Sequence, residues 1–306
     1  MGNICKNKKG SKVIFAYAIN QDIEDEDFYQ PLVSFVIPVL NSERTLERCL
    51  KSIICQNYPK VEILVIDGGS TDSSIDIAKR YGAKICHLKG PLGDVRKVGI
   101  DNSSGELIAL WDSDVYIPHP KWLLQSVNVL NKFPKASTLW IRTVPPPNAG
   151  VIAKAYDWFS WTTMLIFARK RVGFWGGGIS IFRKKAVEDV GGITKGIDTG
   201  EDYDLARKLA MKGYEVVFYD DPVYHDSHNT LSELVRKDLR RAKNFKKRGL
   251  TPSTGIQLRE LVIVNLTVGF FLSLKNLFTK KKAYFGIVPI LLLLRLITYS
   301  IRYLLQ

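Results

Sequence analysis

The hydrophobic and polar positions between residues 32 and 111 fall into blocks that predict strands and helices in alternation. Continuous apolar runs of strand length lie at 32–39, 61–67, 83–88 and 105–111. Apolar residues recur at helical spacing in the segments between them, at 42–56, 70–82 and 93–103. Strands that alternate with helices predict an α/β fold, with a Rossmann-like, mostly parallel sheet flanked by helices and joined by right-handed crossovers.

Polar side chains follow three of these strands directly. Asn41 and Glu43 come after the first strand, Asp67 ends the second, and Asp112 and Asp114 follow the fourth in "LIALWDSDVYIP". An isolated D-x-D is most often a solvated turn, because Asp and Ser favour turns. Parallel strands, however, bring their carboxyl ends to one edge, where open α/β sheets bind ligands. Three strands that end in this way favour a binding site.

Paired carboxylates at a sheet edge suit a hard divalent cation. Mg²⁺ or Mn²⁺ would bind oxygen ligands there and would neutralise a diphosphate. The chain has no G-x₄-G-K-[ST] motif, and "GGSTD" at 68–72 does not match G-x-G-x-x-G. The sequence therefore favours a nucleotide held through a metal and acidic side chains over NAD binding or ATP hydrolysis.

The positive charge of the chain is concentrated near its C-terminus. The net charge is +14 over 306 residues, and residues 231–306 hold 15 Lys and Arg against three acidic residues, an excess of 12. The same region contains the apolar runs 261–274 and 283–294. Basic residues beside long apolar runs indicate an anionic membrane surface rather than a nucleic acid. We expect a membrane-associated protein with its α/β domain on the cytoplasmic face.

The two apolar runs allow two arrangements. A full crossing needs about 20 apolar residues, and Lys275 and Arg295 interrupt the runs. A membrane hairpin would also place the basic loop 280–282 on the far side of the bilayer, against the positive-inside tendency. Helices that lie in the membrane interface are the alternative. The sequence leaves the choice between the two open.

Four domains are expected along the chain. Residues 1–30 form a loosely held N-terminal extension, and 31–230 form the α/β domain. Residues 231–255 form a basic amphipathic helix and linker, opened by a Thr230-x-x-Glu233 capping box. Residues 256–306 form a membrane-associated segment of two apolar helices. A further segment, 153–171, carries aromatic residues between basic ends and suits either a membrane interface or the core.

Three stretches, taken together, resemble glycosyltransferase family 2, whose fold is called GT-A. They are "VSFVIPVLNSERTLERCLKSIICQNYPKVEILVIDGGSTDSS", "GDVRKVGIDNSSGELIALWDSDVYIP" and "GGGISIFRKKAVEDVGG" with "GEDYDLARKLAMKGYEV". The resemblance covers about residues 32 to 245. It implies transfer of a sugar from a nucleotide diphosphate donor, with inversion at the anomeric carbon and with a divalent metal ion.

The resemblance also assigns roles on the donor side. It makes the turn at Pro38, Asn41 and Glu43 a nucleotide contact, and it makes Asp67 the acid that reads the base. Arg96 matches an arginine that the family usually follows with Asn, whereas this chain has Lys97. That departure puts the local donor contact in doubt.

The metal and acceptor roles come from the same resemblance. Asp114 is implied as a direct metal ligand, Asp112 as a contact to ribose or metal, and His225 as a further metal ligand. Asp202 in "TGEDYDL" is implied as the general base. The acceptor side is expected to include the following residues: Gly177 and Gly178 of "WGGGIS", Glu201, and Arg240 and Arg241 of the basic helix.

Membrane association makes the chain similar to polyprenyl- or dolichyl-phosphate sugar transferases. A polyprenyl phosphate is therefore the first acceptor hypothesis, and a hydroxyl of a lipid-linked saccharide or glycolipid is the second. The processive members' Q-x-x-R-W motif is replaced by "RKDLRRAKNF", which disfavours polymer synthesis. A membrane-tethered nucleotide-sugar binding protein without turnover is the non-enzyme alternative. The oligomeric state is not indicated.

Overall fold

The computed structural model describes residues 3–6, 12–16, 29–170, 179–198, 200–226, 230–236, 239, 267–280 and 283–304. The chain forms two compact units. The first comprises residues 1–143 and 171–225, and the second comprises residues 144–170 and 226–306. Residues 144–170 were expected within the α/β domain, but they belong to the unit of the C-terminal helices.

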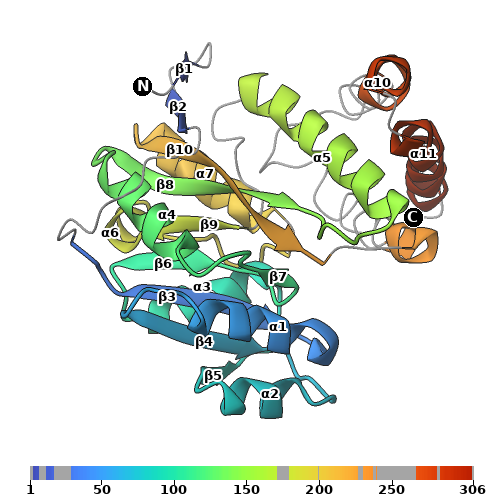
Figure 1. The fold of residues 1–306 in the computed structure, drawn as a ribbon. Coiled ribbons are helices and arrows are strands. Elements are labelled where there is room, and N and C mark those ends of the chain that lie inside the picture. Colours follow the sequence, from blue (N-terminus) through green and yellow to red (C-terminus); the bar gives the residue numbers. More distant parts are fainter. Residues whose placement is uncertain are drawn as a thin grey trace. The chain divides into compact units, whose positions relative to one another are not determined.

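The first unit is built on one sheet, coloured from blue to orange in Figure 1. Its strands in the described part of the chain are β1 (Asn3–Lys6), β2 (Lys12–Ala16), β3 (Val33–Val39), β4 (Val61–Asp67), β5 (Lys84–His87), β6 (Leu107–Leu110), β7 (Val115–Tyr116), β8 (Ala136–Val144), β9 (Ser180–Arg183) and β10 (Glu215–His225). The helices of this unit are α1 (Glu43–Ile54), α2 (Ser74–Arg80), α3 (Leu92–Asn102), α4 (Trp122–Asn131), α6 (Lys184–Asp189) and α7 (Glu201–Met211).

The sheet is mixed rather than uniformly parallel. Its strand order is β1-β2-β10-β8-β9-β6-β3-β4-β5, and β7 pairs with β10 outside this path. Strands β6, β3, β4 and β5 are parallel to one another, as the alternating pattern predicts. Strand β9 is antiparallel to both of its neighbours, β6 and β8. The α/β fold of a sheet flanked by helices is confirmed, and its antiparallel half is the part that the pattern did not predict.

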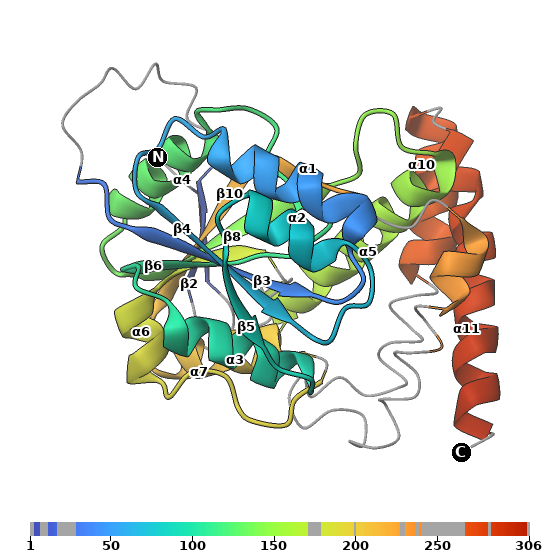
Figure 2. The same cartoon turned by 90° about the horizontal axis from the view of Figure 1, so that it is seen from below.

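Alternate residues of the central strands enter two separate cores. On β3, Phe35 and Ile37 pack with residues of α1, α2 and α4, whereas Val36 packs with residues of α3, α6 and α7. Strand side chains point alternately to opposite faces of a sheet, so continuous apolar runs require helices on both sides. Figure 2 shows α1, α2 and α4 on one face and α3, α6 and α7 on the other.

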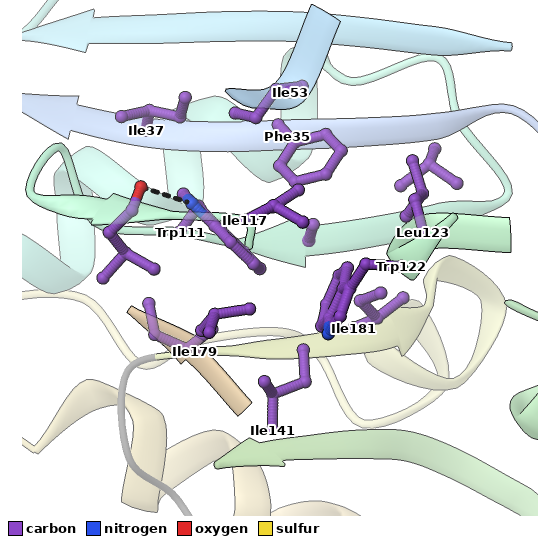
Figure 3. Close-up of a cluster of buried hydrophobic side chains, with 14 of the residues drawn as sticks. Phe35, Ile37, Ile53, Trp111, Ile117, Trp122, Leu123, Ile141, Ile179 and Ile181 are labelled. Atoms are coloured by element: carbon purple, nitrogen blue, oxygen red, sulfur yellow. Dashed lines mark hydrogen bonds between the residues drawn. The ribbon is translucent and has the colours of Figure 1, made fainter. Parts of the chain in front are cut away.

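Aromatic side chains occupy the centre of the first core. Trp111 makes edge-on contacts with Phe35 and with Trp122, with ring centroids 5.2 and 5.8 Å apart. Figure 3 shows Trp111 and Trp122 among Ile117, Ile179 and other aliphatic residues. Trp111 is completely buried and directly precedes Asp112. The acidic segment is therefore attached to a rigid part of the core.

Helix α3 lies unusually close to the sheet. A Cβ atom at Gly99 would lie 2.3 Å from Val36 Cγ1 and 2.7 Å from Ile66 Cδ1. Only glycine allows this separation, because protein interiors are already close-packed. The position of α3 matters for the site because the helix carries Arg96.

A buried polar cluster links strands at the edge of the sheet opposite the carboxyl ends of β3 and β4. Glu62 accepts hydrogen bonds from Ser34 Oγ and from the backbone N–H and hydroxyl of Ser104, and it pairs with Lys84 Nζ. Burial alone would raise the pKa of Glu62, but these donors outweigh it and lower the pKa to about 2. This carboxylate stabilises the sheet away from the candidate site.

The N-terminal extension contributes strands that the sequence did not predict. Strand β2 lies parallel to β10, with Val13 opposite Val216, and β1 lies antiparallel to β2. Valine, isoleucine and phenylalanine in "KVIFA" favour a strand. The partner strand is about 200 residues away in the sequence, so a local pattern could not identify it.

The elements of the second unit in the described residues are helical, apart from the last residue of β8. The unit contains α5 (Val151–Lys170), the π-helical turn η1 (Thr267–Leu272), α10 (Ser273–Lys280), the 3₁₀ turn η2 (Ala283–Gly286) and α11 (Val288–Leu304). The expected capping box is present, since Glu233 N donates to Thr230 Oγ1 and Thr230 N donates to Glu233 Oε2. Residues 231–236 are helical, and most of the expected helix beyond them lies outside the described residues. Among the helices described, none is both long enough and apolar enough to cross a membrane.

Candidate active site

The turn between β6 and β7 carries Asp112 and Asp114. Val115 N donates to Asp112 O at 3.1 Å and closes a tight turn. The indole of Trp111 donates to Val115 O at 3.1 Å, the dashed line in Figure 3. Because Trp111 is held in the core, both ends of the turn are fixed. The two carboxylates are therefore held at the carboxyl end of β6, as the strand order predicts.

Strand pairing brings Asp114 next to His225. Strand β7 is antiparallel to the end of β10, with Val115 opposite His225. This register places Asp114 Oδ2 3.2 Å from His225 Nε2. Both side chains are partly exposed. The expected pair of metal ligands, 111 residues apart in the sequence, is thus brought together by two short strand segments.

Arg96 lies beneath these carboxylates rather than on the surface of the site. Its side chain is only 2% exposed. Nη2 is 2.7 Å from Asp112 Oδ1, and Nη1 is 3.1 Å from Glu201 Oε1. Nε has no hydrogen-bond partner among the described residues. A direct contact between Arg96 and a donor was expected, but the structure makes Arg96 a buried cation that joins two acidic residues.

Helix α7 begins with Glu201 and Asp202 at the same part of the sheet. Glu201 is buried, and Asp202 is partly exposed. Burial raises the pKa of Glu201 to about 7, although Arg96 opposes this rise. At Gly93, a Cβ would lie 2.6 Å from Ile197 O and 3.3 Å from Glu201 Cβ, so the first turn of α3 approaches the segment before α7 closely.

Asp67 ends β4 and organises the loop that follows. It is 3% exposed, and it accepts hydrogen bonds from the backbone N–H groups of Gly69 and Ser70. Its Oδ2 is also 3.2 Å from His87 Nδ1. Burial acts to raise the pKa of Asp67, but the hydrogen bonds prevail and lower it.

His87 was missed in the sequence analysis. It stands opposite Asp67 in the register of β4 and β5, and its side chain is mostly exposed. The rule that identified Asp67 could have identified His87, because His87 is the last residue of the next parallel strand. It belongs to the same edge of the sheet.

Asn41 and Glu43 connect the loop after β3 to the loop after β4. Asn41 has a φ of 50°, a left-handed conformation that asparagine tolerates better than most residues. Its Oδ1 accepts a hydrogen bond from Thr71 N at 2.9 Å. Glu43 Oε2 accepts one from Ser73 N at 3.1 Å. Pro38, near the end of β3, is half-buried. All three expected donor contacts therefore lie at the same edge as Asp67.

The described residues thus bring most of the predicted site together. Apart from Arg96, which lies on α3, the expected residues of the donor and metal site lie at or just after strand ends, and Glu201 and Asp202 lie at the start of α7. Four expected acceptor-side residues lie outside the described residues: Gly177, Gly178, Arg240 and Arg241.

The donor set at Asp114 and His225 suits a divalent cation. Within the described part of the chain, no three His, Cys, Asp or Glu side chains are grouped as a complete metal cage. Mg²⁺ is typically held by one or two protein carboxylates together with substrate phosphates and water. Adjacent ligands of an octahedral ion with bonds of about 2.1 Å lie about 3 Å apart, close to the 3.2 Å between Asp114 Oδ2 and His225 Nε2. The pair therefore fits two neighbouring ligand positions.

The sequence of this fold matches a known protein family. The model of "Glycosyl transferase family 2" matches residues 34–191, more than half of the chain. The chain belongs to glycosyl transferase family 2. It is 30% identical over 223 residues to glycosyltransferase AglE of Haloferax volcanii, an alignment that covers 70% of this chain and 72% of that protein. The protein is accordingly a glycosyltransferase.

Solved structures support the GT-A-like fold of this family 2 enzyme. A mannosyltransferase from Pyrobaculum calidifontis, solved with GDP-Man and Mn²⁺, superposes with a TM-score of 0.61 at 17% identity and covers 91% of this chain and 90% of its own. The glucosyl-3-phosphoglycerate synthase of Mycobacterium tuberculosis, solved with Mn²⁺, UDP-glucose and phosphoglyceric acid, gives a TM-score of 0.51 at 18% identity, covering 73% and 81%. At these identities, the likeness concerns the fold.

Proposed function

We propose that this family 2 glycosyltransferase moves a sugar from a UDP- or GDP-sugar to a membrane-resident acceptor, with inversion and with the aid of Mg²⁺ or Mn²⁺. The observation that carries the proposal is the convergence at one sheet edge of Asp67, Asp112, the Asp114–His225 pair and the start of α7. Carboxylates and a nucleotide diphosphate are both negatively charged, so this set of acidic groups suits a diphosphate only if a cation lies between the carboxylates and the phosphates. The nucleotide sugars and Mn²⁺ in the two solved relatives support the same reading.

The donor would lie across the ends of β3, β4 and β6. In this proposal Asp67 recognises the base, with His87 beside it, and the turn of Asn41 and Glu43 borders the nucleotide. Asp112 contacts ribose or the metal ion. Because Arg96 is buried, its role is to hold Asp112 toward the donor rather than to touch the diphosphate itself.

Asp114 and His225 would hold the divalent cation. When bound, the ion would offset the negative charge of the diphosphate leaving group. The strands supply the remaining requirement, which is a fixed geometry. The pairing of β7 with β10 sets the separation of the two side chains before any ligand arrives, so little reorganisation is needed on binding.

Asp202 would act as the general base for an acceptor that must lose a proton. It stands at the first turn of α7, next to buried Glu201, and is partly open to solvent. A carboxylate at a helix N-terminus is also favoured by the helix dipole. Arg96 pairs with Glu201 and so fixes the first turn of the helix that carries Asp202.

A polyprenyl phosphate, of the dolichyl type, is the proposed acceptor. The excess of basic residues and the apolar runs after residue 231 support a lipid-linked acceptor at a membrane. The catalytic unit would work at the cytoplasmic face. A hydroxyl of a lipid-linked saccharide or glycolipid is the alternative acceptor.

The two acceptor classes make different demands on Asp202, which allows a direct test. A hydroxyl must be deprotonated as it attacks, and a base contributes about 10² to 10⁴ in rate. A phosphate monoester has a second pKa of about 6 and is already anionic at neutral pH. Asp202→Asn should therefore reduce transfer to a hydroxyl acceptor by about 10² to 10⁴ and transfer to a polyprenyl phosphate by less than about tenfold.

The matched control is Asp101→Asn. Asp101 is an exposed carboxylate at the far end of α3, where it pairs with Lys97, and its replacement should leave both activities unchanged. If Asp202→Asn retained full activity with every acceptor of both classes, Asp202 would not be the base. If it abolished transfer to the phosphate acceptor as fully as transfer to the hydroxyl, the acceptor assignment would fail.

A further inference from the structure

Helix α11 packs against the rest of the second unit along one side only. Val288, Leu291 and Leu292 on that side are buried. The guanidinium of Arg295 lies over the ring of Tyr156 on α5, and Arg295 Nη2 donates to Tyr156 OH at 3.3 Å. One side of α11 is therefore packed on the protein and even accommodates a charged side chain.

The other side of α11 is apolar and exposed. Ile290, Leu293 and Ile297 follow one another at spacings of three and four residues, so they share one face of the helix. Between 45% and 59% of each residue is exposed. A helix that faced only water would carry polar residues at these positions. This face is suited to an apolar environment.

The helical segment that precedes α11 presents the same kind of surface. Phe270, Phe271 and Phe278 are between 47% and 76% exposed, and Lys275 between them is also exposed. Phe271, Lys275 and Phe278 are spaced by four and three residues, which places them on one face where η1 passes into α10. Aromatic rings interspersed with lysine are typical of a segment at a membrane–water interface.

The net charge of the C-terminal segment indicates what these exposed apolar faces contact. Residues 261–306 include six Lys and Arg and no Asp or Glu. A second copy of the chain would bring together two segments with this excess of positive charge, which electrostatic repulsion disfavours. The surface of an anionic bilayer offers both the apolar layer and the complementary charge.

We propose that the apolar face of η1, α10 and α11 lies in the interface of an anionic bilayer, with its helices parallel to the membrane plane. The face is defined by Phe270, Phe271, Phe278, Ile290, Leu293 and Ile297. Helix α11 does not cross the bilayer, because its opposite side is occupied by α5 and η2 and because Arg295 lies near its middle. Its 17 residues span about 26 Å, and its exposed face enters the bilayer only to the depth of its side chains.

The proposal adds to the proposed function the surface by which the enzyme would meet a lipid-linked acceptor, but it can be tested without the transfer reaction. The 306-residue chain is mixed with vesicles of phosphatidylcholine alone, or of phosphatidylcholine with phosphatidylglycerol, and its partition onto the vesicles is measured by flotation. The wild-type chain should bind the anionic vesicles more tightly, and added salt should weaken that binding.

Two double variants probe the two parts of the face. Phe271→Ser with Phe278→Ser, and Ile290→Ser with Leu293→Ser, should each lower the partition coefficient at least about tenfold, as expected for the loss of two inserted apolar side chains. Met211→Ser is the matched control. Met211 lies on α7 in the other unit and is 71% exposed, similar to Phe271 at 68%. Its replacement should leave partition unchanged.

Three results would overturn the proposal. The first is an unchanged partition of both double variants, with folding verified by circular dichroism. The second is a wild-type dimer in solution that the same substitutions dissociate without any effect on vesicle binding, which would assign the face to a second copy. The third is protection of the basic loop 280–282 from protease added on the side of the main domain, which would indicate a crossing helix. Loss of sugar transfer without loss of vesicle binding would count against the proposed reaction only.

Discussion

Replacement of Arg96 by methionine should destabilise the protein in a manner that depends on pH. Methionine fills a similar volume without the charge, so Asp112 and Glu201 lose their shared partner. The side chain of Asp112 is 36% exposed and can be hydrated, whereas that of Glu201 is only 5% exposed. The cost of an unpaired carboxylate therefore falls on Glu201.

The size of this pH-dependent loss of stability follows from the ionisation of Glu201. Burial raises its pKa in the folded chain to about 7 from an ordinary value of 4.5. The folded state thus binds a proton that the unfolded state has released, and the free energy of unfolding falls as the pH rises from 4.5 to about 7. Without Arg96 the pKa of Glu201 in the folded state rises further. The free energy of unfolding of the variant therefore continues to fall above pH 7, at about 1.4 kcal/mol per pH unit. The variant should lose about 2 kcal/mol more at about pH 8.5 than at about pH 6.

Urea unfolding, followed by tryptophan fluorescence at the two pH values, measures this difference. The double variant Arg96→Met with Glu201→Gln cannot ionise at position 201 and should show no extra loss at the higher pH. If Arg96→Met lowered the free energy of unfolding by the same amount at both pH values, Glu201 would not be the group that Arg96 compensates. The same would follow if the double variant still lost more stability at the higher pH.

Three further predictions concern other parts of the fold. Glu62→Gln should lower the free energy of unfolding at neutral pH by about 2 kcal/mol. The difference from wild type should vanish as the pH falls from about 4.5 to about 2, where the native carboxylate binds its proton. If urea unfolding gave the same difference between variant and wild type at every pH, this prediction would be wrong. Gly99→Ala should lower the free energy of unfolding by about 1 to 3 kcal/mol, because it overpacks the contact of α3 with the sheet. Gly150→Ala is the control, because a Cβ there meets nothing within 4 Å, and it should leave the melting temperature unchanged. Equal melting temperatures for the two variants would refute the close approach of α3 to the sheet. His225→Ala should weaken activation by Mn²⁺ at least about tenfold. His119→Ala is the control, because it breaks a similar pair, His119 Nε2 with Asp221 Oδ2 at 3.1 Å, that is not part of the proposed metal site, and it should leave activation unchanged. Equal activation curves for the two variants would remove His225 from the metal site.

The parallel half of the fold was predictable because its strands and helices have clear local periodicity. The segment 61–67 is the strand β4 at the bounds expected, and α1 and α3 begin and end within two residues of the expected positions. Helix α2 begins at Ser74 rather than at residue 70. The residues before it bind side chains from neighbouring loops instead, and such bonds compete with helix formation.

The convergence of the site was predictable from topology, but its contacts were not. Strand order alone brings Asp67 and Asp112 to one edge of the sheet. Asp114 and His225 are 111 residues apart, and their pairing depends on the two-residue strand β7. Such a short strand leaves no periodic signal in the sequence.

The burial of Arg96 also escaped the sequence analysis, because arginine is rarely buried without a partner. A signal was nevertheless present. Gly93, Arg96 and Ile100 are spaced by three and four residues, so they share one face of α3, and that face is the one packed in the protein. The spacing identifies the buried face, but only the structure supplies Glu201 as the partner that makes burial tolerable.

The central claim, a metal-assisted transfer from a nucleotide sugar, is tested most directly by a donor panel. UDP- and GDP-sugars with a radiolabelled sugar are incubated with the enzyme and membranes that supply polyprenyl phosphate, with Mn²⁺ or with a chelator. We predict that label from a nucleotide sugar enters the organic phase only with the metal, and that Asp114→Asn abolishes this transfer without changing the unfolding midpoint. Undiminished transfer in the chelator and in Asp114→Asn, or no transfer from any donor with the metal present, would contradict the account.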